Sequence, residues 1–136
     1  MSQPEIRLSL TLEGTVAPSE DPAKVKEAMA NVLGDCRHSI EQDASRIKVS
    51  SDDARCIRRL RDQLRDRHVR SAARKLLYAG REGKRSTVML NRQAARAGVL
   101  VLCGSEAESP LGPLFLTIRS DDLDAVIESL TAYEGG

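Results

Sequence analysis

The basic residues between Arg55 and Lys75 form the densest group of chemically active side chains in this sequence. Nine basic residues lie in this stretch against two acidic ones, which leaves a local excess of seven positive charges. Eight of the nine are arginines, and a planar guanidinium suits bidentate contact with phosphate or carboxylate better than an ammonium group does. The stretch therefore indicates a surface that binds an anionic partner.

The spacing of these residues places them in rows. Side chains three or four positions apart lie side by side on a helix, and two triplets of arginines follow such steps, 58–61–65 and 67–70–74. The candidate phosphate-binding residues share a basic side chain at an expected surface position: Arg58, Arg61, Arg65, Arg67, His68, Arg70, Arg74, Lys75 and Arg92.

The basic stretch has a second interpretation, a solvated face whose charges pair locally with Asp62 and Asp66. Two acids cannot neutralise the local excess, which favours phosphate binding. From Glu106 onward the chain carries seven acidic residues against one basic residue, Arg119, so charge is distributed unevenly. Aromatic side chains number only three, and single-stranded RNA is usually held by stacking on aromatic rings. The sequence therefore favours contact with the backbone of structured RNA.

Two helices, and not one, are expected to position these arginines. Leu60 lies on one apolar stripe and Ala73 on another, and the second stripe is rotated by roughly a third of a turn on a helical wheel. One straight helix would expose one of the stripes, so we expect a break near Arg65–His68, with Asp66 capping the second helix. That helix is expected to end near Gly80.

The remaining elements follow from apolar periodicity and capping residues. Strands are expected over residues 6–13, 46–49, 86–90, 98–103 and 113–118. Asp21 and Pro22 predict the start of a helix that ends at Gly34, and Ser120 is expected to cap a final helix. The order β-α-β-α-α-β-β-β-α predicts a single α+β domain over 1–136, with a mainly antiparallel sheet and helices packed on one side.

Two short segments, LNRQAA from Leu90 and ESPLGP from Glu108, are not explained by apolar periodicity. Asn91 and Gln93 are positioned either to read bases or, for Asn91, to cap a short helical turn over residues 91–97. In the second segment Pro110 and Gly112 favour turns that fix the loop. The alternative interpretation is that Glu108 and Ser109 present a polar surface to a partner.

The stretch from Ser86 to Ile118 resembles an archaeal protein family of unresolved function, usually labelled RNA-binding, whose fold is similar to that of the ribosomal protein that binds 5S ribosomal RNA. The resemblance rests on residues in and around the two segments: Thr87, Leu90, Asn91, Gln93, Ala94, Ala95, Gly98, Glu108, Ser109, Pro110, Leu111, Gly112 and Pro113. It extends more weakly over nearly the whole chain. It implies the same fold and an RNA partner.

The composition and the motifs of the sequence argue against a membrane protein, a secreted protein and a metal-binding protein. Apolar residues make up 40% and charged residues 30% of the 136 positions, and no apolar run approaches the length of a membrane span. No secretory signal is visible at the start, so we expect a cytoplasmic location. Cys36, Cys56 and Cys103 form no CxxC pair or even framework, and we expect all three to be reduced. We expect no cofactor and no metal, because Cys36 and His38 lack a second pair of ligands.

The sequence therefore predicts a non-catalytic RNA-binding protein that contacts RNA through its arginine-rich helices. The first alternative is a protein–protein adaptor or regulatory subunit that uses the same basic face for an acidic partner, including the acidic segment of a second copy in a homodimer. An enzyme acting on a phosphorylated small molecule is the third interpretation.

Overall fold

The computed structural model describes residues 8–131 except 35, 54, 65–66 and 110; the side chains of residues 67 and 68 also lie outside the description. Its strands are β1 (Leu8–Thr15), β2 (Ser39–Gln42), β3 (Arg46–Ser51), β4 (Arg81–Glu82), β5 (Arg85–Leu90), β6 (Leu102–Cys103) and β7 (Leu114–Ser120). Its helices are α1 (Pro22–Leu33), α2 (Arg55–Gln63), α3 (Arg67–Ala79), α4 (Arg92–Arg96), the 3₁₀ turn η1 (Glu106–Glu108) and α5 (Leu123–Thr131).

The strands form one antiparallel sheet in the order β2-β3-β1-β7-β5-β4, and β6 pairs with β5. On β1 the alternation expected from the sequence is present: Leu10 and Leu12 are buried, while Ser9 is exposed and Thr11 is half-buried. Alternate residues of a strand point to opposite faces, so one face of the sheet carries the core and the other carries polar side chains.

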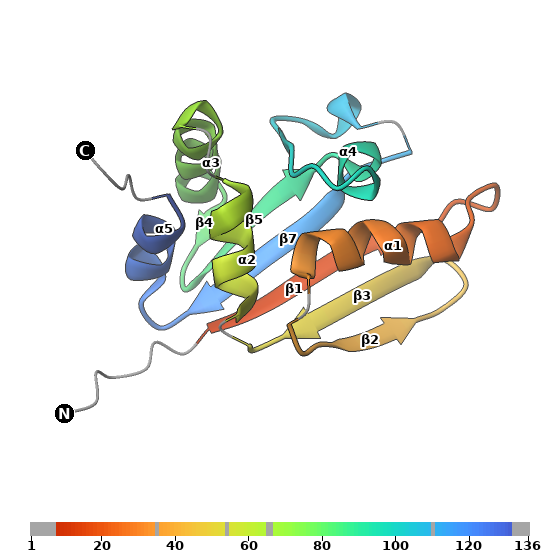
Figure 1. Ribbon diagram of the computed structural model, residues 1–136, viewed down its shortest axis with the longest axis horizontal. Helices are drawn as coiled ribbons and strands as arrows, with labels where there is room; N and C mark the ends of the chain where they lie inside the picture. The colour runs from red at the N-terminus through yellow and green to blue at the C-terminus, as the bar shows by residue number, and fades with distance from the viewer. Residues whose placement is uncertain (1–7, 35, 54, 65–66, 110, 132–136) are drawn as a thin grey trace.

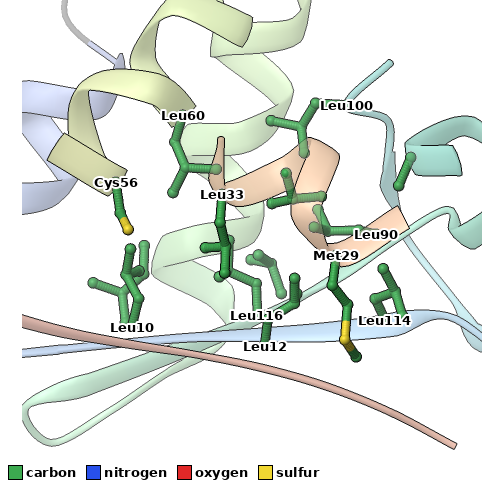
Figure 2. Packing of buried hydrophobic residues seen from close by; sticks show 14 of the residues in the cluster. Leu10, Leu12, Met29, Leu33, Cys56, Leu60, Leu90, Leu100, Leu114 and Leu116 are labelled. Carbon is green, nitrogen blue, oxygen red and sulfur yellow. The ribbon is translucent and has the colours of Figure 1, made fainter. Parts of the chain in front are cut away.

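The helices cover the apolar face. Figure 1 shows α1 and α4 over one end of the sheet and α2, α3 and α5 grouped over the other. Side chains of the sheet such as Leu12 meet Met29 and Leu33 of α1 and Leu60 of α2 in one continuous core, shown in Figure 2. These side chains are at most 2% exposed, and full burial of each stabilises the fold by roughly 1.5–3 kcal/mol.

Local capping explains where α1 begins and ends, as the sequence predicted. The carboxylate of Asp21 accepts a hydrogen bond from the Ala23 N–H at 3.0 Å, and Pro22 supplies the first helical residue. Gly34 ends the helix with a φ of 67°, and its N–H donates to the carbonyl of Ala30.

The predicted fold class is confirmed, and α2 and α3 are separate helices as expected, while three details are wrong. The cap expected at Asp66 lies outside the described residues. The sequence missed two strands: β2, whose four residues are all exposed at a sheet edge, and β4, which has only two residues. Neither has an apolar period to detect. The strand expected over residues 98–103 is reduced to Leu102–Cys103. Ser120 lies in β7, and its hydroxyl accepts from the Asp122 N–H at 3.1 Å just before α5, but the residue that caps α5 is Asp122, whose carboxylate accepts from the Ala125 N–H at 3.2 Å.

Candidate functional site

Helix α2 presents arginines around a buried side that includes Cys56 and Leu60. Arg58 is exposed, and Arg59 is exposed with Nη2 donating to the carbonyl of Asn31 at 3.2 Å. Arg55 forms an ion pair of 2.8 Å with Asp53 at the start of the helix. The guanidinium of Arg55, with the backbone N–H groups of Arg37 and Arg55, holds the pKa of Asp53 well below its usual range.

Helix α3 buries Ala73 and Leu77 and does not expose the predicted arginine row as a unit. Arg70 is half-buried, and its Nε donates to the carbonyl of Leu64, so it is only partly exposed and its guanidinium is engaged within the fold. Arg74 is exposed but pairs with Glu128 of α5 at 2.6 Å. Arg65 and the side chains of Arg67 and His68 lie outside the described residues.

The acidic C-terminal segment neutralises part of the basic region. Besides Arg74, Glu128 accepts a hydrogen bond from the Tyr78 hydroxyl at 2.9 Å, and this bond raises the pKa of Tyr78. Arg81 also pairs with Asp124 of α5. The charge separation seen along the sequence is therefore reduced in space, because α3 and α5 are packed together.

Arg92 is not a surface residue, and its predicted contact with RNA is wrong. It is 4% exposed, because its guanidinium joins three parts of the fold. Nη1 donates to the Thr15 carbonyl at 2.6 Å and to both carboxylate oxygens of Glu20 at 2.8 Å. Nη2 donates to the Pro113 carbonyl at 3.4 Å, and Nε is buried and has no hydrogen-bond partner among the described residues. The residue therefore offers no guanidinium to an RNA backbone on the outer surface, and it contributes instead to the wall of a neighbouring pocket.

The LNRQAA and ESPLGP segments are joined to each other by hydrogen bonds. The Asn91 carboxamide caps α4 by accepting from the Ala94 N–H at 2.9 Å, and its Nδ2 donates to the carbonyl of Glu108 at 3.3 Å. Ser109 is buried, and its hydroxyl accepts from the Arg92 N–H and donates to the Gly112 carbonyl. Capping is thus the observed role of Asn91. Pro110 lies outside the described residues.

A pocket of about 290 Å³ lies beside this junction, between the β1–α1 loop, α1, α4 and the loop before β7. Arg92 and Gln93 of the predicted set line it. Lys24, Arg96 and Leu111 also line it. Counting charge along the sequence missed Lys24 and Arg96 as site residues, because they come from separate helices, and Leu111 was named only as part of the family resemblance. Of these three residues, Leu111 has an unusual backbone conformation with a positive φ, and this is seen in the structure and not in the sequence.

The cysteines differ from the expectation that all are reduced. Cys36, just after α1, and Cys56, in α2, form a disulfide with their Cα atoms 5.5 Å apart, which ties the two helices together. Twenty positions separate the two cysteines, so their spacing carries no signal for a disulfide. Cys103 is free and buried, and burial, followed by the charge of Glu108, raises the pKa of its thiol.

The fold and the interlocked segments define a small α+β protein with one core, helices on one face of an antiparallel sheet, and no described helix long and apolar enough to cross a membrane. No model of a known protein family matches the chain. The UPF0201 protein of Metallosphaera sedula is 39% identical over 125 residues, covering 91% of this chain and 86% of the relative. That of Sulfurisphaera tokodaii is 35% identical over 125 residues, covering 90% and 86%.

The chain therefore belongs to the UPF0201 family of archaeal proteins. A crystal structure of the UPF0201 protein from Methanococcus jannaschii superposes with a TM-score of 0.76, covering 94% of this chain and 96% of that one. At 23% identity this match shows a shared fold. The similarity to the ribosomal protein that binds 5S ribosomal RNA stays a prediction.

Proposed function

We propose that this protein is a non-catalytic RNA-binding protein whose α2–α3 face contacts the backbone of structured RNA. One observation carries the proposal: Arg58 and Lys75 are exposed, and no carboxylate of the described residues lies within ion-pair distance of either. Cationic side chains without internal partners release counterions when they meet phosphates, which favours binding.

The positions of the aromatic rings support contact with phosphates over stacking on bases. Tyr78 is the described aromatic residue of the α2–α3 region, and its hydroxyl is bound to Glu128 while Arg74 lies 5.8 Å above its ring. Phe115 lies on the opposite face of the sheet, between the buried neighbours Leu114 and Leu116. The basic face therefore offers no stacking platform among the described residues, and RNA bound there is held by its backbone.

The adaptor alternative is less well supported. A protein interface needs an apolar centre as well as charge. The large apolar side chains that are exposed in the described residues are Ile40, Val99, Val101 and Leu111, and none belongs to α2 or α3.

The double variant Arg58→Gln/Lys75→Gln tests the proposal. Both side chains are exposed, so folding stability should change little. A fluorescently labelled RNA hairpin is titrated at several salt concentrations, with Lys26→Gln/Arg119→Gln as the control. Lys26 and Arg119 are also exposed, and the control removes the same two charges from α1 and from β7.

We expect the test variant to bind more weakly and the slope of log affinity against log salt to flatten by about two units, since each lost phosphate contact removes roughly 0.9. The preference among RNA sequences should not change. Equal affinity and slope in the test variant and the parent, or a loss confined to the control, would place RNA elsewhere. A parent that binds no RNA but retains an acidic protein through Arg58 and Lys75 would establish the adaptor instead.

A further inference from the structure

Most residues of the two interlocked segments have a clear role in folding, but Gln93 and Leu111 do not. Asn91 caps α4, Arg92 pairs with Glu20, and Ser109 fixes the loop. The Gln93 side chain is exposed and forms no hydrogen bond in the part of the chain that the structure describes. Leu111 is 56% exposed. Both residues line the same pocket, whose volume is about 290 Å³.

The backbone of Leu111 is strained without a benefit to packing. Its φ of 68° places it in the left-handed region, and it is the one non-glycine residue with positive φ among those described. This conformation is unfavourable for a residue with a Cβ, and glycine would adopt it freely. A side chain that is costly in its backbone position and more than half exposed points to a role in binding.

The pocket combines apolar walls with a positive rim. Val25 and Ala28 are buried and, with Leu111, supply the apolar surface. The Glu20 carboxylate is already paired with Arg92, and Asp21 caps α1, whose positive end offsets its charge.

Two cationic side chains at the rim of the pocket have weak ion-pair contacts or none among the described residues. Lys24 has no ion-pair partner among the described residues, and Arg96 lies 3.8 Å from Glu27 in a contact where both side chains are about half exposed. Together with the Gln93 carboxamide they provide donors for a negatively charged group. The volume lies near the lower end of the roughly 300–1,000 Å³ found for small-molecule sites, which limits the ligand to a small one.

We propose that this pocket binds a small organic anion, a carboxylate or a phosphate monoester, that carries a short apolar group. The apolar group packs on Leu111 and Val25. The anionic oxygens accept hydrogen bonds from Lys24, Arg96 and Gln93. This site is separate from the α2–α3 face and does not depend on RNA binding.

Three probes test the ligand class by isothermal titration and by amide chemical shifts: butyrate, monobutyl phosphate and the neutral butyramide. We expect at least one anionic probe to bind at millimolar concentration and to shift the amides of residues 92–96 and 111–112. The stronger of the two anions identifies the carboxylate or the phosphate source. Binding of butyramide as tight as that of the anions, or no binding by either anion, would overturn the proposal.

Two variants locate the binding. Lys24→Gln/Arg96→Gln should weaken the better anion by at least about tenfold, because it removes two charge-assisted hydrogen bonds. The matched control Lys26→Gln/Arg119→Gln, with the same change in charge, should change the affinity by less than about twofold. Equal effects in the two pairs would mean that the anions respond to net charge alone, and the proposed site would be rejected.

A third variant separates binding from folding. Leu111→Gly relaxes the strained backbone and leaves the pocket without its apolar lip, so the Tm should stay the same or rise while affinity for the better anion falls several-fold. A fall in Tm would show that Leu111 serves the fold, and unchanged affinity would show that it does not contact the ligand. Either result would overturn its assigned role.

Discussion

The Arg92→Ala substitution is expected to lower the free energy of unfolding by about 3 kcal/mol, because it leaves the carboxylate of Glu20 buried and unpaired. The two side chains are 5% and 11% exposed. The carbonyls of Thr15 and Pro113 lose a donor at the same time. Removing one partner of a buried pair costs about 3–5 kcal/mol. The lower end applies here because the adjacent pocket lies open to water beside Glu20.

Arg96→Ala is the matched control. It removes an arginine from the same helix and changes the net charge equally. The Arg96 side chain is 47% exposed and lies 3.8 Å from Glu27, so its loss should cost less than about 1 kcal/mol. The difference between the two variants measures what burial adds to the Arg92 contact.

Urea unfolding followed by circular dichroism gives both values, provided that the m-values agree. A double-mutant cycle with Glu20→Gln isolates the pair: once the carboxylate is neutral, losing Arg92 should cost less by about 1–2 kcal/mol. If Arg92→Ala is no more costly than Arg96→Ala, or if the cycle is additive, Arg92 does not hold the fold in the way described. The folded fraction of Arg92→Ala should still bind RNA as the parent does, since a buried guanidinium makes no contact with phosphate.

Gly80→Ala is expected to destabilise the protein strongly, because a Cβ there would lie 2.1 Å from the carbonyl oxygen of Thr87, a backbone atom that cannot move aside cheaply; an unchanged Tm would contradict this close approach of α3 to β5. Without reductant, the unfolded protein should present one reactive thiol, that of Cys103, whereas three would disprove the disulfide. The folded-state pKa of Asp53 is lowered, so its contribution to stability is complete above the ordinary value of about 4 and is lost as the pH falls below it. Asp53→Asn should therefore lose less Tm than the parent between about pH 7 and about pH 3, and parallel losses would refute the assignment.

Local patterns in the sequence predicted most of the elements. The alternation in β1, the Asp21–Pro22 start and Gly34 end of α1, and the break between α2 and α3 depend on residues within one or two turns or a single strand. Such signals depend on backbone geometry and on the apolar period of one segment, so they can be recognised without knowing which other segments pack against it. The edge strand β2 carries no such signal, because its four residues are exposed and only pairing with β3 defines it.

The assignment of charged and sulfur-containing side chains depended on tertiary structure. An arginine in a polar segment looks the same whether it is exposed or buried, and the partner that buries Arg92, Glu20, lies 72 positions away. The Cys36–Cys56 disulfide and the pairing of Glu128 with Arg74 likewise join residues that the chain alone does not bring together. The sequence thus determined most of the helices and strands, apart from the edge strand β2 and the two-residue strands β4 and β6. The packing of α1, α4 and α5 decided which charges are neutralised inside the fold and which remain available to a ligand, because electrostatic pairing depends on distance in space.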